Sequence, residues 1–217
     1  MCQYSNGMAS NKNHKQHRRY ELRERALRRE RTRLRITEAA VALHGTVGPA
    51  NTTISDVARL AGVQRMTVYN HFATDADLFD ACSTHWITRN LPPDADAWGP
   101  IEDPRERIGA ALREMYVYYS RNRKMLGNVL RDAPLIPALG SIMSQKWWPV
   151  IEHMVDVLAG GIRTGEKADD YQRATLRLVL DFHTWRTLTG SGLDDEESAR
   201  LAARLAARLV AETPAEG

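Results

Sequence analysis

Apolar residues recur at helical spacing along most of this chain of 217 residues. A clear example follows Pro104, where Ile108, Leu112, Met115 and Tyr119 occupy positions i, i+4, i+7 and i+11 of one helix face. No segment of useful length alternates apolar and polar residues with the period of a strand. The pattern therefore predicts an all-α fold.

A long helix is predicted from about Tyr20 to His44, because this run contains no Gly or Pro and is rich in Leu, Arg, Glu and Ala. Its apolar positions become regular only in the second half, so we expect the first half to project as a solvated basic rod. Residues before about Gln16 are polar and aperiodic, and we expect them to be disordered in isolation. Gly45 and Gly48 end the helix.

Three short helices are predicted after this long one. Thr53 and Thr74 each begin an S/T-x-x-D/E capping box, so they mark the starts of the first and the third. Gly62 breaks the first helix, and the second extends from Gln64 to His71. The predicted order is a helix, a tight glycine turn, a second helix and a supporting helix.

The later helices are larger and amphipathic, and the change of character places a domain boundary in the loop around residues 91–100. Asp103 is the predicted N-cap of the first of them. A second carries Trp147 to Leu158, with a kink expected at Pro149. The last two are expected over residues 170–188 and 195–210.

Positive charge is concentrated near the N-terminus. Residues 1–90 hold 14 Lys and Arg against 8 Asp and Glu, whereas residues 91–217 hold 16 against 19. Residues 1–53 alone carry 11 basic and 4 acidic groups. This asymmetry indicates that the N-terminal part faces a polyanion.

The segment from Thr53 to Leu78 has the features of a helix-turn-helix, in which one helix enters the DNA major groove while the other lies across it. Its second helix carries side chains that bond to DNA: Arg and Gln can bond bidentately to guanine and adenine, and Thr, Tyr and His commonly reach phosphates. The candidate DNA-binding residues are Gln64, Arg65, Thr67, Tyr69, Asn70 and His71, together with Thr53, Arg28 and Arg29.

The second helix ends in Tyr69, Asn70, His71 and Phe72, an ending that resembles the TetR family of transcriptional regulators. The resemblance covers about residues 32–85. It implies that Gln64, Arg65 and Asn70 supply much of the base reading, and that Thr67, Tyr69 and His71 contact the DNA backbone.

The charge, the helical pattern and the resemblance together predict a domain organisation. A basic, partly disordered arm at residues 1–24 precedes a three-helix helix-turn-helix domain at residues 25–90. A larger helical domain at residues 91–217 then binds an unknown small-molecule effector and forms a homodimer. A twofold dimer predicts a palindromic operator on double-stranded DNA, and family analogy favours a repressor that its effector releases.

One residue departs from the family pattern. Many members carry a phosphate-clamping lysine just inside the fourth helix, where this chain has Asp75. We therefore hypothesise that the arm compensates through phosphate or minor-groove contacts; the alternative is a solvated tail. The arginines in question are Arg18, Arg19, Arg23, Arg25, Arg28 and Arg29.

Two candidate sites are predicted in the C-terminal part. Aromatic and sulfur-containing residues either line an effector cavity or form the core: Tyr116, Tyr119, Met143, Trp147, Met154, Phe182, His183 and Trp185. The last two helices, which have small and apolar faces, are expected to pair across a dimer interface. Its predicted residues are Leu201, Leu205, Leu209, Ala202 and Ala206.

Other classes of function have little support. No Gly-rich phosphate loop, nucleophile elbow or HExxH motif is present, so we expect no enzyme, no cofactor and no metal site. Cys2 and Cys82 are expected to be free thiols, and His14 and His17 part of a solvated tail. We expect a cytoplasmic protein without a membrane partner. A ligand-independent architectural DNA-binding protein is the alternative function.

Overall fold

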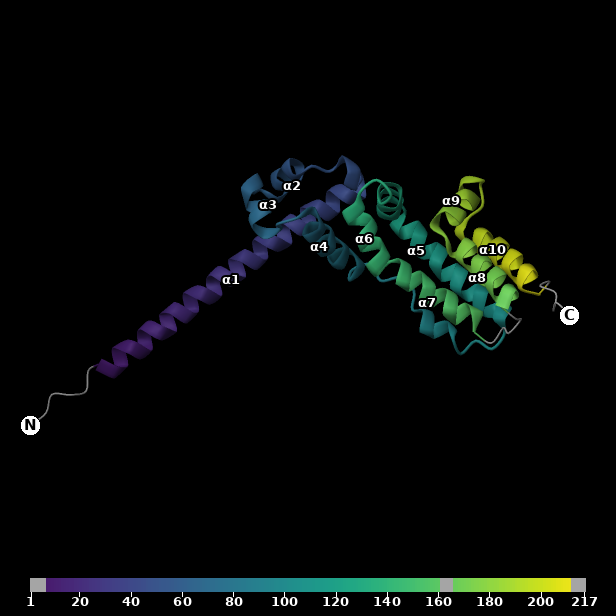
Figure 1. Cartoon of the computed structure of the whole chain (residues 1–217), viewed down its shortest axis with the longest axis horizontal. Helices are drawn as coiled ribbons and strands as arrows, with labels where there is room; N and C mark the ends of the chain where they lie inside the picture. Colours follow the sequence, from purple (N-terminus) through teal and green to yellow (C-terminus); the bar gives the residue numbers. More distant parts are fainter. Residues whose placement is uncertain (1–6, 161–165, 212–217) are drawn as a thin grey trace, which may run out of the picture.

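The computed structural model describes the backbone of residues 7–160 and 166–211, and the side chains of residues 17–160 and 170–208. The described residues are mostly helical and contain no strand, which confirms the all-α prediction. The molecule is elongated: a long helix projects from one end and leads into a set of short helices, and a larger bundle follows (Figure 1). No helix within the described ranges is long and apolar enough to cross a membrane.

The N-terminal part is built from one long and three short α-helices, with a 3-10 turn between the first two. These elements are α1 (Gly7–Thr46), η1 (Pro49–Asn51), α2 (Ile54–Ala61), α3 (Arg65–His71) and α4 (Asp75–Ile87). They share a small core in which Ile36 and Ala40 of α1 meet Val57, Val68 and Phe72. Burial of these side chains fixes α2 and α4 against the C-terminal half of α1, and α3 packs against α2.

The first half of α1 has no such partners. It begins at Gly7, so the predicted start at Tyr20 is wrong by more than three turns. The reason is that no Gly or Pro interrupts the chain between Gly7 and Gly45, and nothing in the sequence stops the helix earlier. Tyr20 and Leu22 are exposed, and the helix stands away from the body as a basic rod, as predicted (Figure 1).

The C-terminal part is a helical bundle. Its elements are η2 (Ala95–Trp98), α5 (Pro104–Asp132), α6 (Pro137–Lys146), α7 (Trp148–Ala159), α8 (Glu166–Leu180), α9 (Phe182–Gly190) and α10 (Asp195–Ala211). The helix α5 runs through the middle and packs along α10. Two buried tyrosines tie it to α8, because Tyr116 donates to Val179 O at 2.9 Å and Tyr119 to Leu180 O at 2.5 Å.

Two predicted helices are each divided in the structure. The chain turns at Trp147, and Pro149 lies in the first turn of a new helix, where its missing N–H costs no hydrogen bond. The predicted helix over residues 170–188 breaks at Asp181, whose carboxylate accepts from the backbone N–H of His183 at 2.7 Å and so caps α9. The last helix, predicted over residues 195–210, is confirmed as α10.

The ends of α1 and α5 meet at a polar junction that links the two parts of the chain. The buried Asp132 carboxylate accepts from the backbone N–H of Ala50 at 2.9 Å and from Arg131 Nε at 2.6 Å. The bond from Arg131 holds the pKa of Asp132 below its ordinary value, so the carboxylate stays charged. Gly48, at φ +94°, lies directly against both side chains. The junction sets where the short helices stand relative to the bundle.

Candidate nucleic-acid interface

The helices α2 and α3 are joined by a turn whose geometry follows from its residues. Thr53 caps α2: its hydroxyl oxygen accepts from the Asp56 backbone N–H at 3.1 Å and donates to the Asp56 carboxylate at 2.6 Å. Gly62 ends α2 at φ +65°, a left-handed conformation that glycine adopts without strain. The predicted helix, glycine turn and second helix are confirmed.

The helix α3 turns one face inward and presents the other to solvent. Val68 and, just after the helix, Phe72 are buried in the N-terminal core. Thr67 and His71 are half-buried at the edges of the outward face. The exposed residues at and beyond the start of the helix are Gln64, Arg65, Met66, Tyr69 and Asn70. Most of the predicted DNA-binding side chains therefore share one accessible surface.

Arginines of α1 lie beside the C-terminal end of α3. Arg33 donates from Nη1 to the carbonyl oxygen of His71 at 2.6 Å, and its guanidinium stacks 4.1 Å above the Phe72 ring. The pKa of His71 lies below its ordinary value, first because of burial and then because of the positive charges of Arg29 and Arg33. A neutral His71 and two cations thus meet where α1 passes α3.

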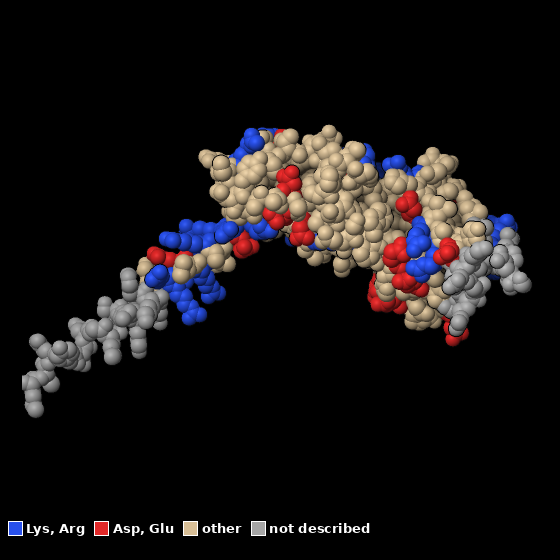
Figure 2. Space-filling view, in the orientation of Figure 1, with Lys and Arg blue, Asp and Glu red and all other residues tan. Residues whose placement is uncertain are grey.

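Basic side chains continue along the exposed part of α1. Figure 2 shows Lys and Arg gathered on the projecting helix next to the short helices, while acidic side chains cluster on the larger bundle. The described arginines of this stretch are all exposed: Arg18, Arg19, Arg23, Arg25, Arg28 and Arg29. The positive charge of α1 therefore extends from the projecting half of the helix to Arg33, which contacts the C-terminal end of α3.

The supporting helix α4 begins with the second predicted capping box, which is confirmed. Thr74 N–H donates to Asp77 Oδ2 at 3.0 Å, and Asp77 N–H donates to Thr74 Oγ1 at 3.1 Å. Asp75 is exposed in the first turn, where a carboxylate is favoured by the positive end of the helix dipole. The acidic residue that departs from the family pattern thus has a structural reason, and it faces solvent near α3.

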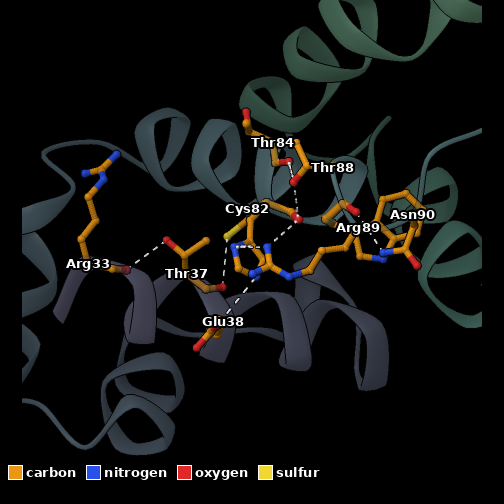
Figure 3. A network of polar contacts seen from close by, with 10 residues as sticks. Arg33, Thr37, Glu38, Cys82, Thr84, Thr88, Arg89 and Asn90 are labelled. Atoms are coloured by element: carbon orange, nitrogen blue, oxygen red, sulfur yellow. Dashed lines mark hydrogen bonds and ion pairs between the residues drawn. The ribbon is translucent and has the colours of Figure 1, made fainter. Parts of the chain in front are cut away.

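The helix α4 is held to α1 by contacts along its length (Figure 3). Cys82 Sγ lies 3.8 Å from the carbonyl oxygen of Thr37, and burial raises the pKa of this thiol to about 12. His85 Nε2 lies 3.9 Å from Glu38 Oε1, and Arg89 Nη1 lies 3.0 Å from His85 Nδ1. The contacts of Cys82 and His85 join α4 to α1, so the two helices together support α3.

The predicted effector residues do not form one cavity. The structure places Tyr116, Met154 and Trp185 in the packed core, and His183 is exposed. Only Met143 and Trp147 line the apolar cavity between α4 and α6, while Tyr119, Trp147 and Phe182 reach a separate hollow near Asp181. Core packing, the alternative interpretation, is therefore correct for several of them.

Some of the predicted dimer residues are buried within the chain, and others are exposed. Ala202 and Ala206 are buried against α5 of the same chain, so they cannot also contact a partner. Leu201 and Leu205 are exposed on α10. The side chain of Leu209 lies outside the described residues, as do Cys2 and the His14 side chain.

Two residues of the interface were not predicted from the sequence. Met66 is 66% exposed on the outward face of α3. Its helical spacing from the inward Val68 and Phe72 could have predicted this exposure. Arg33 of α1 contacts His71 of α3, which lies 38 residues later in the sequence. No local sequence pattern indicates such a contact.

Comparisons with known proteins agree with this geometry. Residues 36–82 match the family model described as bacterial regulatory proteins, tetR family. A search of curated protein sequences found no match. Among solved structures, a TetR-like transcriptional regulator from Rhodococcus sp. RHA1 is 22% identical with a TM-score of 0.55, covering 84% of this chain and 97% of its own.

Two further structures have the same fold. A TetR transcription regulator from Haloarcula marismortui is 21% identical with a TM-score of 0.54, covering 84% of this chain and 97% of its own. The multidrug binding protein EbrR, complexed with imidazole, is 22% identical with a TM-score of 0.58, covering 82% and 93%. Residues 36–82 therefore form a helix-turn-helix domain of the tetR family, and the chain around them has the fold of the TetR-family transcriptional regulators.

Proposed function

We propose that this protein is a dimeric transcriptional repressor that binds a palindromic operator and is released by a small-molecule effector. The observation that carries the proposal is the exposed polar face of α3 beside the arginines of α1, within the segment that matches the tetR family. A domain boundary near residue 90 fits a DNA-binding part and an effector-binding part, since separate apolar cores lie on either side of this residue.

The roles of the interface residues follow from their chemistry and position. Gln64, Arg65 and Asn70 are exposed on α3 and can bond to base edges in the major groove. Met66 adds an apolar contact of the kind that thymine methyl groups accept. Backbone phosphates are assigned to Thr53, Thr67, Tyr69 and His71, and to Arg28 and Arg29 on α1.

The dimer is proposed on the outer faces of α8 and α10. Tyr171 and Leu178 on α8 are exposed at 71% and 60%, and Leu201 and Leu205 on α10 at 37% and 51%. Exposed apolar side chains on two neighbouring helices favour pairing with the same helices of a second chain, which buries them in a twofold four-helix bundle. Such a dimer presents two copies of α3 to a palindrome.

The effector site is proposed in the cavity between α1, α4, α5 and α6, in place of the aromatic core of the bundle. Its lining includes Phe79 and Trp86 on α4 together with Ile142 and Met143 on α6. A ligand here touches the support of α3 directly, so its binding free energy can favour one spacing of the two α3 helices over another.

A footprinting experiment with competitor DNA tests this function. We expect the purified protein to protect one palindrome in the presence of excess random DNA, as a complex that contains two chains. Protection that disappears with competitor, or that shows no preferred sequence, would instead identify the architectural DNA-binding protein.

Replacing Asp75 by Lys is expected to strengthen DNA binding. The variant exchanges an exposed negative charge near α3 for a positive one, so we expect about tenfold tighter binding and a salt dependence steeper by about one unit. Asp75→Asn, which only removes the repulsion, should give a smaller gain. Fluorescence anisotropy over a range of salt concentrations measures the affinity and the salt dependence of each variant. Unchanged or weaker binding by Asp75→Lys would place this residue away from the phosphates.

A further inference from the structure

The apolar cavity between the short helices and the bundle has one charged side chain, Lys146, in its lining. It has a volume of about 60 Å³, and its walls are formed mainly by aromatic, aliphatic and sulfur-containing side chains. Lys146, in the last turn of α6, is the one Lys, Arg, Asp or Glu among the lining residues. An ammonium group beside an apolar cavity favours a ligand that is itself part apolar and part anionic.

The other titratable groups of the lining carry no charge. Burial lowers the pKa of His44 to about 4, so its imidazole is neutral at physiological pH. The buried Cys82 remains a thiol for the same reason. Lys146 is therefore the only fixed charge available to a ligand in this cavity.

In the structure, Lys146 bonds to α4. Its ammonium nitrogen lies 2.7 Å from Asp80 Oδ1 and 2.5 Å from Thr84 Oγ1, so it joins the end of α6 to the middle of α4. The Asp80 side chain is 57% exposed, whereas that of Lys146 is 26% exposed. Water can therefore solvate the carboxylate as soon as it leaves, and a second anion can take its place on the ammonium.

We propose that the cavity binds an organic acid with an apolar body, whose carboxylate replaces that of Asp80 on Lys146. The inference rests on the proposed function, since it assigns a ligand class to the effector site. The exchange removes the ion pair between α6 and α4 and leaves Lys146 bound to the ligand. The support of α3 thereby loses one of its ties to the bundle when the acid binds.

The size of the cavity limits the ligand. A volume of about 60 Å³ holds only a small group without adjustment. Met125 and Met143 are in the lining, and methionine side chains adapt their shape at low cost. A single phenyl ring on a short chain is therefore a suitable apolar body for a probe.

A second basic surface lies nearby and provides the control. An outer hollow lined by Arg121, Arg123 and Lys124 shares Val41, Trp86 and Met125 with the cavity. The cationic side chains of this rim could also bind the carboxylate of an acidic ligand. Lys124 is exposed and lies outside the lining of the cavity itself, so Lys124→Met is the matched control for Lys146→Met.

The experiment compares phenylbutyrate, phenylbutanol and phenylbutylamine by calorimetry on the full chain. We expect phenylbutyrate to bind most tightly, and Lys146→Met to weaken it by about tenfold or more while changing phenylbutanol by less than about twofold. Asp80→Asn should strengthen phenylbutyrate several-fold, because the competing carboxylate is gone. This second variant keeps the test valid if Lys146→Met is unstable.

Several results would overturn the proposal. Equal binding of the three probes, or no binding of any at millimolar concentration, would exclude an acid at this cavity. A loss of phenylbutyrate binding in Lys124→Met and not in Lys146→Met would place the anion on the outer rim. Operator binding by the ligand-free chain is measured separately, so a failure to bind DNA would refute the proposed function without bearing on the ligand class.

Discussion

Deleting residues 1–24 is expected to weaken operator binding by about a hundredfold at physiological salt and to flatten its dependence on salt concentration. The segment carries five Lys and Arg against two Asp and Glu. Loss of roughly three phosphate contacts would reduce the salt slope by about 2.7, which corresponds to about two orders of magnitude in affinity. Fluorescence anisotropy at several salt concentrations measures both quantities.

A matched variant separates charge from helix length. Replacing Arg18, Arg19 and Arg23 by Gln keeps α1 intact, because Gln is also a good helix former, and removes only the charge. We expect it to reproduce most of the effect of the deletion. A salt slope that is unchanged in both variants would show that the projecting helix is a solvated tail.

Gly48→Ala is expected to destabilise the protein by about 3 kcal/mol, the largest effect on stability that we anticipate for a single methyl group. Gly48 has φ +94° and ψ 157°, a conformation that residues with a Cβ rarely adopt. An added Cβ would come within 2.7 Å of Asp132 Oδ2 and closer still to Arg131 Nη2. The substitution therefore strains the backbone and disrupts the junction between α1 and α5 together. Urea unfolding measures the loss.

Gly62→Ala provides the control for this prediction. Gly62 also has a positive φ, at +65°, but no atom lies within 4 Å of a Cβ built there. Its replacement should cost only about 1 kcal/mol, which is the penalty of the left-handed backbone alone. Equal losses of stability in the two variants would show that the clash of the added Cβ with Arg131 and Asp132 does not destabilise the protein.

The helix-turn-helix could be predicted from the sequence because its signals are local. The two capping threonines and Gly62 each fix a helix end through bonds within a few residues. The breaks at Trp147 and Asp181 were harder to predict, because Pro in a first turn and Asp at an N-cap are also compatible with the helical pattern on either side. Periodicity alone does not decide between a kinked helix and two helices.

The candidate sites were predictable to different degrees. The exposed face of α3 followed from its inward residues, whereas Arg33 was missed because its contact with His71 is distant in sequence. The apolar cavity shares only Met143 and Trp147 with the predicted effector residues, since its walls come from α1 and α4 as well as from the bundle. Ala202 and Ala206 were assigned to a partner chain because a small-residue face looks the same whether it meets α5 or a second copy.

The helix α1 connects the proposed functions. Arg29 and Arg33 lie near the end of α3, while Val41 and His44 closer to the C-terminal end of α1 line the cavity. The same helix packs against α2, α4 and α5. A ligand that moves the end of α1 or the middle of α4 would therefore act directly on the helix that carries the proposed DNA-binding arginines.

Selection of bound sequences from a pool of random double-stranded DNA tests the central claim most directly, because it examines DNA binding, sequence preference and twofold symmetry in one measurement. We expect the full chain to enrich one palindromic motif, whose two half-sites match the two copies of α3 in a dimer. Enrichment of no motif, or of a single half-site without its symmetric partner, would contradict the account of a dimeric operator-binding regulator.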